Sequence, residues 1–167
     1  MRYFTRGFMD GDLDDDEQAL ARTAYASRIE AILPRLPAPV ASLAGLDLHD
    51  GCIESVVWEP ACKRLQLSVV VWHPAGHQAV TLRYGAALLG KRRVQALHAV
   101  ALDRETQILA SEVDCDNDGT FSHRLLFWPR DELTIDFAEL TCEVTGRPDG
   151  RVNLRPFFTQ IDAPNLE

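Results

Sequence analysis

Residues 65–72 decide the fold class: Leu65-Gln66-Leu67-Ser68-Val69-Val70-Val71-Trp72. Apolar side chains occupy every second position from Leu65 to Val71, and the polar Gln66 and Ser68 lie between them. Successive side chains of a strand point to opposite faces of a sheet, so this period of two predicts a strand with one buried face. The stretch is also far too short for a membrane-spanning helix, which needs about 20 apolar residues.

The period of two continues over most of the chain after about residue 46. Turn residues such as Asn117-Asp118-Gly119 separate the segments and are typical of hairpins. The last long segment changes parity between Phe137 and Leu140, which predicts a β-bulge at Ala138 or Glu139. The predicted strands are one ending at Trp58, then 65–71, 80–84, 108–113, 121–128, 133–144 and an edge strand within 152–161.

Two segments have helical spacing instead. The first begins at Asp14, which can cap a helix together with Glu17 three residues later, and it ends at Pro34. A second, short helix is predicted over residues 94–102. The apolar positions of the first helix predict one buried stripe, made of Leu20, Ala24, Tyr25, Ile29, Ile32 and Leu33.

These patterns predict an α+β protein with a mainly antiparallel twisted sheet, an N-terminal helix and one short middle helix. The sheet is expected as a meander, a sandwich-like arrangement or a partly closed barrel. Pro34, Pro37 and Pro39 form a stiff connection, which suggests an internal boundary. Residues 1–39 would then hold an aromatic segment, an acidic helix and this connection, and residues 40–167 the β domain, as one folding unit overall. We expect the opening segment 1–10 to dock on a larger body.

The charge is concentrated in one segment. The chain of 167 residues carries a formal net charge of -8, and six acids lie within residues 10–17. The rest is nearly neutral, whereas a phosphate backbone requires a concentrated basic face, so we expect no nucleic-acid partner. The acidic segment would instead steer the protein toward a basic protein surface. We therefore expect a protein partner or self-association, the latter through the edge strand within 152–161, and no membrane partner.

The cysteines indicate the compartment. Cys52, Cys62, Cys115 and Cys142 form no C-x-x-C pair, and no secretory signal is evident. Free thiols in a reducing compartment are the expectation, and hence a cytoplasmic protein.

No cofactor is expected. Residues 85–92 approach the frame of a phosphate-binding loop, but Arg92 stands where Ser or Thr would hold magnesium.

Two groups of residues are candidates for binding a metal. Asp114, Asp116 and Asp118 have the spacing that opens an EF-hand loop, yet position twelve is Leu125 and the flanks alternate as strands, which favours an acidic hairpin tip. His73 and His77 bracket a turn, an arrangement that would let their rings meet across a hairpin mouth and grip a transition metal. Two ligands are too few for a zinc site, and solvated loop histidines are the simpler interpretation.

His49, Asp50 and His123 are the candidates for catalysis. His123 shares a strand face with Phe121 and Leu125, so we expect it to be at least partly buried. A buried imidazole needs a hydrogen-bond partner, and a carboxylate such as Asp50 or Asp114 is one option. The structural role is favoured over the catalytic one. The alternative is a metal-dependent hydrolase or small-ligand binder that uses His49, Asp50 and His123 in a concave face of the sheet.

Three stretches of the chain resemble a group of small bacterial proteins of unknown function. The stretches are Tyr3-Phe4-Thr5, Leu48-His49-Asp50-Gly51, and residues 112–114 through 121–129. These proteins open with a Tyr-Phe-Thr segment and a helix and continue with a β-rich domain. The resemblance implies that fold but assigns no activity. Small β-rich immunity proteins that neutralise bacterial toxins are a broader analogy. The sequence thus favours a non-catalytic, protein-binding module over an enzyme.

Overall fold

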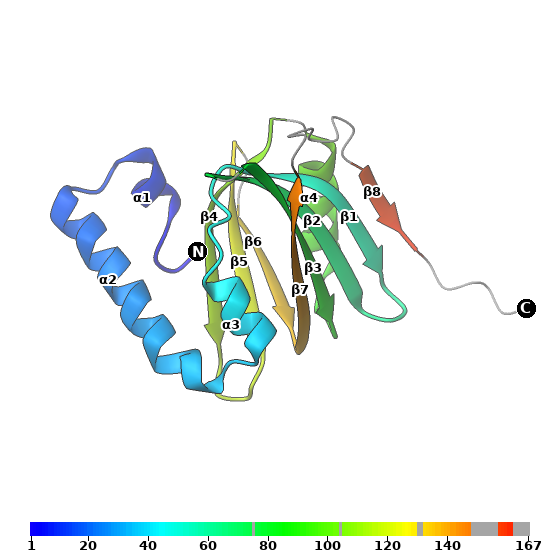
Figure 1. Cartoon of the computed structure of the whole chain (residues 1–167), viewed down its shortest axis with the longest axis horizontal. Coiled ribbons are helices and arrows are strands. Elements are labelled where there is room, and N and C mark those ends of the chain that lie inside the picture. Colours follow the sequence, from blue (N-terminus) through cyan, green and yellow to red (C-terminus); the bar gives the residue numbers. More distant parts are fainter. Residues whose placement is uncertain (75, 104, 130–131, 148–156, 162–167) are drawn as a thin grey trace, which may run out of the picture.

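The computed structural model describes residues 1–74, 76–103, 105–129, 132–147 and 157–161, which form an α+β fold (Figure 1). The predicted fold class is confirmed, with the N-terminal and middle helices in place. The helices are α1 (Arg6–Asp10), α2 (Asp15–Ile32), the 3-10 turn η1 (Leu33–Arg35), α3 (Ala38–Ala44) and α4 (Lys91–Leu102). The strands are β1 (Gly51–Glu59), β2 (Arg64–His73), β3 (Gly76–Gly85), β4 (Gln107–Cys115), β5 (Phe121–Trp128), β6 (Glu132–Phe137), β7 (Glu139–Arg147) and β8 (Phe157–Gln160).

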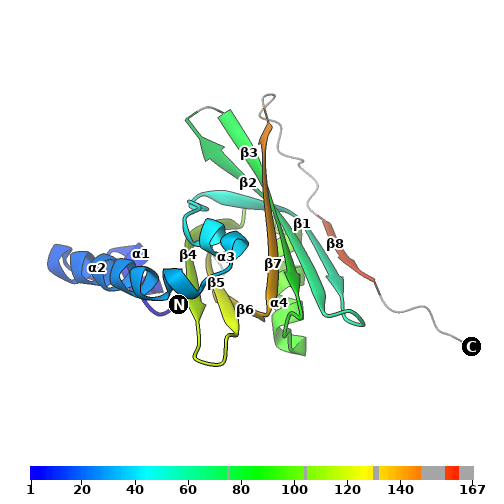
Figure 2. The same ribbon diagram turned by 60° about the horizontal axis from the view of Figure 1, so that its bottom comes forward.

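One sheet contains these strands in the order β6-β5-β4-β1-β2-β3-β7, with β8 added beside β1, and it does not close. The link between β4 and β1 is short, because only Gly51 and Cys52 of β1 pair with β4. The second half of the same β1 edge pairs with β8, in parallel. The sheet therefore divides into two leaves, β4–β5–β6 and β1–β2–β3–β7, which diverge from this link (Figure 2).

The hydrophobic core lies between the two leaves. Leu65, Leu67, Val69 and Val71 are each at most 4% exposed, so the alternation that decided the fold class is confirmed. Each such side chain contributes about 1.5–3 kcal/mol on full burial. The same cluster includes apolar side chains of both leaves and of the helices, among them Val40, Leu43, Leu97, Phe127, Ile135 and Phe137.

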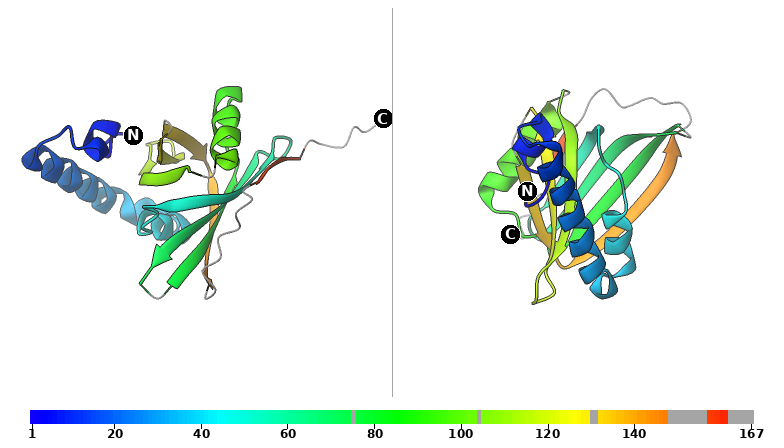
Figure 3. Two further views of the ribbon diagram at one scale, coloured as in Figure 1. Left: turned by 90° about the horizontal axis from the view of Figure 1, so that it is seen from above. Right: turned by 90° about the vertical axis from the view of Figure 1, so that its left-hand side faces the viewer.

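Helix α2 begins and ends as predicted, but it does not bury the predicted stripe. The Asp14 side chain caps it by accepting from the Glu17 N–H, and the Glu17 side chain accepts from the Asp14 N–H, which completes a capping box. The 3-10 turn containing Pro34 follows the last residue of the helix. Ile32 is the buried residue of the helix, whereas Leu20 is 70% exposed. The reason is that the helix packs on the N-terminal segment and on the side of β4 that carries Glu112 and Asp114, rather than on an apolar sheet face (Figure 3).

The proline-rich stretch forms local helical structure. Pro34 lies in η1, and Pro39 lies in the first turn of α3, where a missing N–H costs no helical hydrogen bond. The boundary suggested at residues 39 and 40 thus falls inside α3, whose Val40 and Leu43 belong to the common core.

The predicted β-bulge at Ala138 or Glu139 is wrong. β6 ends at Phe137 and pairs with β5, whereas β7 begins at Glu139 and pairs with β3. The change of parity therefore marks the corner at which the chain passes from one leaf to the other. At this corner the Ala138 N–H donates to the Gly85 carbonyl at 3.1 Å.

The edge strand predicted within 152–161 is present over Phe157–Gln160, and it pairs with β1 of its own chain. Residues 152–156 lie outside the described residues. The middle helix predicted over 94–102 is confirmed and begins three residues earlier, at Lys91. In the described parts of the chain, no helix is both long and apolar enough to cross a membrane.

Candidate functional site

The N-terminal segment docks on the chain's own sheet through the carboxylate of Glu112. This side chain of β4 is fully buried and accepts hydrogen bonds from the backbone N–H groups of Arg2 at 2.9 Å, Tyr3 at 2.7 Å and Phe4 at 2.8 Å. The Arg124 guanidinium of β5 lies 3.7 Å from the same carboxylate. Sequence reasoning missed Glu112, because a lone acid in a strand looks like an ordinary solvent-facing residue.

A second carboxylate, Asp114, holds helix α2. Arg28 donates to its Oδ1 atom from Nε at 2.9 Å and from Nη2 at 2.7 Å, and Arg124 lies 3.5 Å from Oδ2. Burial alone would raise the pKa of Asp114, but the bonds from Arg28 and the Cys115 N–H and the arginine charges outweigh it and lower the pKa. We call residues 1–32, which these contacts hold against β4 and β5, the N-terminal arm.

The loop that follows Asp114 is a hairpin tip. Asp116 accepts hydrogen bonds from the N–H groups of Asp118 at 3.0 Å and Thr120 at 2.8 Å, and Gly119 has the positive φ of 83° that this turn requires. The three candidate ligands are thus used in different ways, since Asp114 binds arginines and Asp116 closes the turn. This geometry agrees with the acidic hairpin tip favoured by the sequence.

The register of β2 and β3 places His73 and His77 on opposite faces of their hairpin. His77 is paired with Trp72, and His73 with Gly76. Directly opposite residues share one face of a sheet, and successive residues alternate, so the two imidazoles belong to opposite faces. This register argues against a joint metal site of the two histidines at the turn. Within the described ranges, no three His, Cys, Asp or Glu side chains lie close enough together to hold a metal ion.

His123 is fully buried in the core, which confirms the predicted burial. Its partners are hydroxyl groups rather than the suggested carboxylates. Nδ1 lies 2.7 Å from the Tyr84 hydroxyl, and Nε2 lies 2.9 Å from the Ser111 hydroxyl. Burial lowers the pKa of His123 to about 3 and raises that of Tyr84. A neutral imidazole thus links β3, β5 and β4 across the core.

The other two candidates for catalysis lie at the surface. His49 donates from Nδ1 to the Leu109 carbonyl at 2.7 Å, and Asp50 donates its N–H to the Ile108 carbonyl at 2.8 Å. The two side chains are 49% and 64% exposed, with 3.6 Å between His49 Nε2 and Asp50 Oδ1. His123 bonds to Tyr84 and Ser111 instead, so the hydrogen bonds do not join the three into one site.

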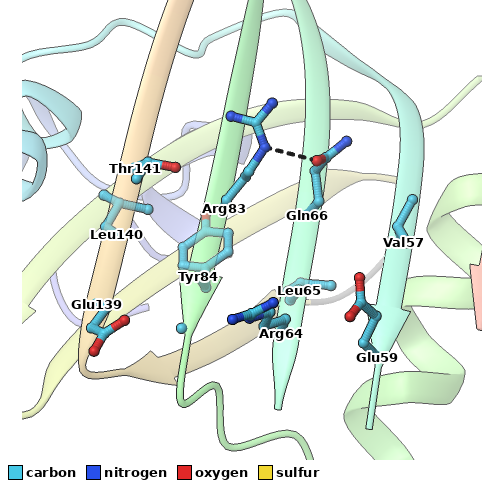
Figure 4. Close-up of a pocket in the computed structure, with 11 residues that line it drawn as sticks. Val57, Glu59, Arg64, Leu65, Gln66, Arg83, Tyr84, Glu139, Leu140 and Thr141 are labelled. Atoms are coloured by element: carbon cyan, nitrogen blue, oxygen red, sulfur yellow. Dashed lines mark hydrogen bonds between the residues drawn. The ribbon is translucent and has the colours of Figure 1, made fainter. Parts of the chain in front are cut away.

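A groove of 530 Å³ lies on the leaf β1–β2–β3–β7 (Figure 4). Cross-strand pairing sets Glu59 beside Arg64 and Gly85 beside Glu139. A Cβ atom on Gly85 would lie 2.8 Å from Oε2 of Glu139, so the missing side chain leaves room for this carboxylate. Arg83 also lines the groove, where it bonds to Gln66 at 3.0 Å and to Glu143 at 2.8 Å. The groove thus presents side chains of both charge signs.

Two further cavities lie on the other leaf. One, of 450 Å³, lies against α4, β5 and β6. The other, of 400 Å³, lies between the arm and β4, and its lining includes Phe4, Phe8, Met9, Leu46, His49 and Ser111.

Comparisons of the chain with protein-family models, curated proteins and solved structures gave no match. The resemblance to the Tyr-Phe-Thr group therefore stays an expectation.

Proposed function

We propose that this protein is a non-catalytic binding module whose acidic N-terminal arm engages a basic surface of a partner protein. The main support is the exposure of helix α2. It has 18 residues, its buried residue is Ile32, and its Leu20 is 70% exposed beside the acidic turn. Figure 1 places the turn between α1 and α2 at the end of the molecule away from β8.

The charge of this turn supports the proposal. Its six acids are all exposed, so their field acts on an approaching partner: Asp10, Asp12, Asp14, Asp15, Asp16 and Glu17. Such a field raises the association rate with a positively charged surface and orients the encounter. Leu20 lies on the first turns of the same helix and adds an apolar contact that is desolvated on binding. The aromatic residues Tyr3, Phe4 and Phe8 do not share this role, because they pack with Tyr25 and one another.

The test compares two variants that carry the same loss of charge. The first neutralises the arm but keeps the capping box of α2, through Asp10→Asn, Asp12→Asn, Asp15→Asn and Asp16→Asn. The control neutralises four carboxylates elsewhere on the chain, through Glu59→Gln, Glu105→Gln, Glu139→Gln and Glu143→Gln.

Each variant is used to capture partners from an extract of the source cells, and the captured protein is identified, purified and titrated with the wild type. We expect a stoichiometric partner that the arm variant loses and the control keeps. Its affinity should fall about tenfold or more between 0.05 and 0.5 M salt, because salt screens exposed charges. Equal capture by both variants, or affinity that salt leaves unchanged, would contradict the proposal.

A further inference from the structure

Strand β4 loses its neighbour after two residues. β1 pairs with Gln107 and Ile108, and the two strands then diverge. β5 pairs with β4 as far as Cys115. In the part of the chain that the structure describes, no strand pairs with the other edge of β4 from Leu109 to Cys115.

Side chains occupy parts of this open edge. His49 donates to the Leu109 carbonyl at 2.7 Å, and the Val113 N–H donates to the Tyr25 hydroxyl at 2.9 Å. Because the Val113 N–H points to the open edge, the alternation of an antiparallel ladder directs the N–H and C=O of Ser111, two residues earlier, to the same side. These two groups of Ser111 have no partner among the described residues.

The 400 Å³ cavity lies against this point of the edge. Leu109, Ala110 and Ser111 line it from β4. Its other walls are the apolar Phe4, Phe8, Met9, Leu46 and Leu48, together with Arg22, Asp47 and His49. The Ser111 hydroxyl bonds to His123 at 2.9 Å, so the groups of Ser111 that are left for a ligand are its backbone N–H and C=O. The volume lies within the range of about 300–1,000 Å³ that is usual for ligand sites.

We propose that this edge and cavity bind a short extended peptide of a partner protein, which pairs with Ser111 and inserts an apolar side chain. One peptide residue offers the C=O and N–H that Ser111 requires. The side chains of the residues next to it in the extended peptide enter the cavity. Strand addition of this kind takes its affinity from main-chain bonds and its specificity from side-chain pockets. His49 and Tyr25 occupy the edge on either side, so the added strand is short. This inference rests on the proposed protein-binding function.

The probe is the blocked peptide acetyl-Ala-Leu-Ala-amide, titrated into 15N-labelled full-length protein and followed by NMR. We expect the largest amide shifts at Ser111 and at the cavity residues Phe8, Met9 and Leu46. A peptide in which both alanines are N-methylated lacks the N–H donor that pairs with Ser111 and should bind at least about tenfold more weakly, as expected from the loss of one hydrogen bond of about 1.4 kcal/mol. Acetyl-Ala-Asp-Ala-amide should produce no shift at Ser111.

Two variants of the arm complete the test. Met9→Asp places a carboxylate in the cavity and should weaken binding at least about tenfold, whereas Ala26→Asp lies on the exposed side of the arm and should leave it unchanged. The NMR spectrum of each variant reports whether the fold is retained. Equal binding of the N-methyl peptide, or shifts that avoid Ser111, would overturn the inference. Should Met9→Asp still capture the whole partner protein, the peptide site is refuted while the binding function stands.

Discussion

Removing the Glu112 carboxylate tests how the arm is held. In Glu112→Ala, the backbone N–H groups of Arg2, Tyr3 and Phe4 lose their acceptor, which lies within 2.7–2.9 Å in the wild type. Arg124 keeps a contact with Asp114 at 3.5 Å, so it is not left without a counter-charge. The perturbation therefore acts mainly on the docking of residues 2–4.

The size of the effect follows from the three lost bonds. A buried donor without a partner costs about 1–3 kcal/mol, so three of them cost about 3–9 kcal/mol while the segment stays docked. A detached arm hydrates these groups, and the free energy of docking therefore limits the loss. We expect the free energy of unfolding to fall by about 3 kcal/mol, the lower end of that range.

Urea unfolding followed by tryptophan fluorescence measures this loss. The control is Glu143→Gln, which removes an exposed carboxylate 2.8 Å from Arg83 and should cost less than about 1 kcal/mol. Limited proteolysis reports separately on the arm, which should be cleaved faster in Glu112→Ala. A loss below about 1 kcal/mol together with unchanged cleavage would refute the role assigned to Glu112.

Three further predictions concern the core. Because the pKa of His123 is about 3 in the folded state, the unfolded chain binds more protons below pH 6.5. The free energy of unfolding should therefore fall by about 1.4 kcal/mol per pH unit from pH 6.5 toward 4. In His123→Gln, the free energy measured by urea unfolding should depend less steeply on pH. Tyr84→Phe leaves a ring nitrogen without a partner and should cost about 1–3 kcal/mol in urea unfolding. Gly51→Ala places a Cβ 2.8 Å from the Leu48 carbonyl oxygen and should cost about 1–3 kcal/mol by thermal unfolding. Gly146→Ala, with nothing within 4 Å of the new Cβ, should stay within about 0.5 kcal/mol.

Local pattern predicted the elements better than their arrangement. The alternation from Leu65 to Val71 and the capping box at Asp14 depend on neighbours in sequence, and both are confirmed. The exposure of Leu20 depends instead on which surface α2 faces. That surface includes β4, whose Val113 follows Tyr25 of α2 by 88 positions. The corner at Ala138 was mistaken for a bulge because both features shift the parity of a strand.

The candidate site shows the same limit. Burial of His123 followed from its apolar strand neighbours, but its partners Tyr84 and Ser111 come from two other strands. Hydroxyl groups of this kind carry no sequence signal that separates them from surface residues. Glu112 could be identified only after the docking of residues 2–4 on β4 was known.

Docking of the arm and binding at the cavity are coupled, because the arm supplies part of the cavity wall. Phe4 receives its position from Glu112, and Phe4 and Phe8 line the cavity beside Ser111. A peptide that binds only the state with a docked arm has an apparent affinity that is reduced in proportion to the fraction of molecules in that state. If the arm stays docked in one tenth of the Glu112→Ala molecules, binding of acetyl-Ala-Leu-Ala-amide should be about tenfold weaker. Saturating peptide should in turn slow proteolysis of the arm, since ligands stabilise the state they bind. Undiminished binding to a variant whose arm is released would show that the peptide binds elsewhere.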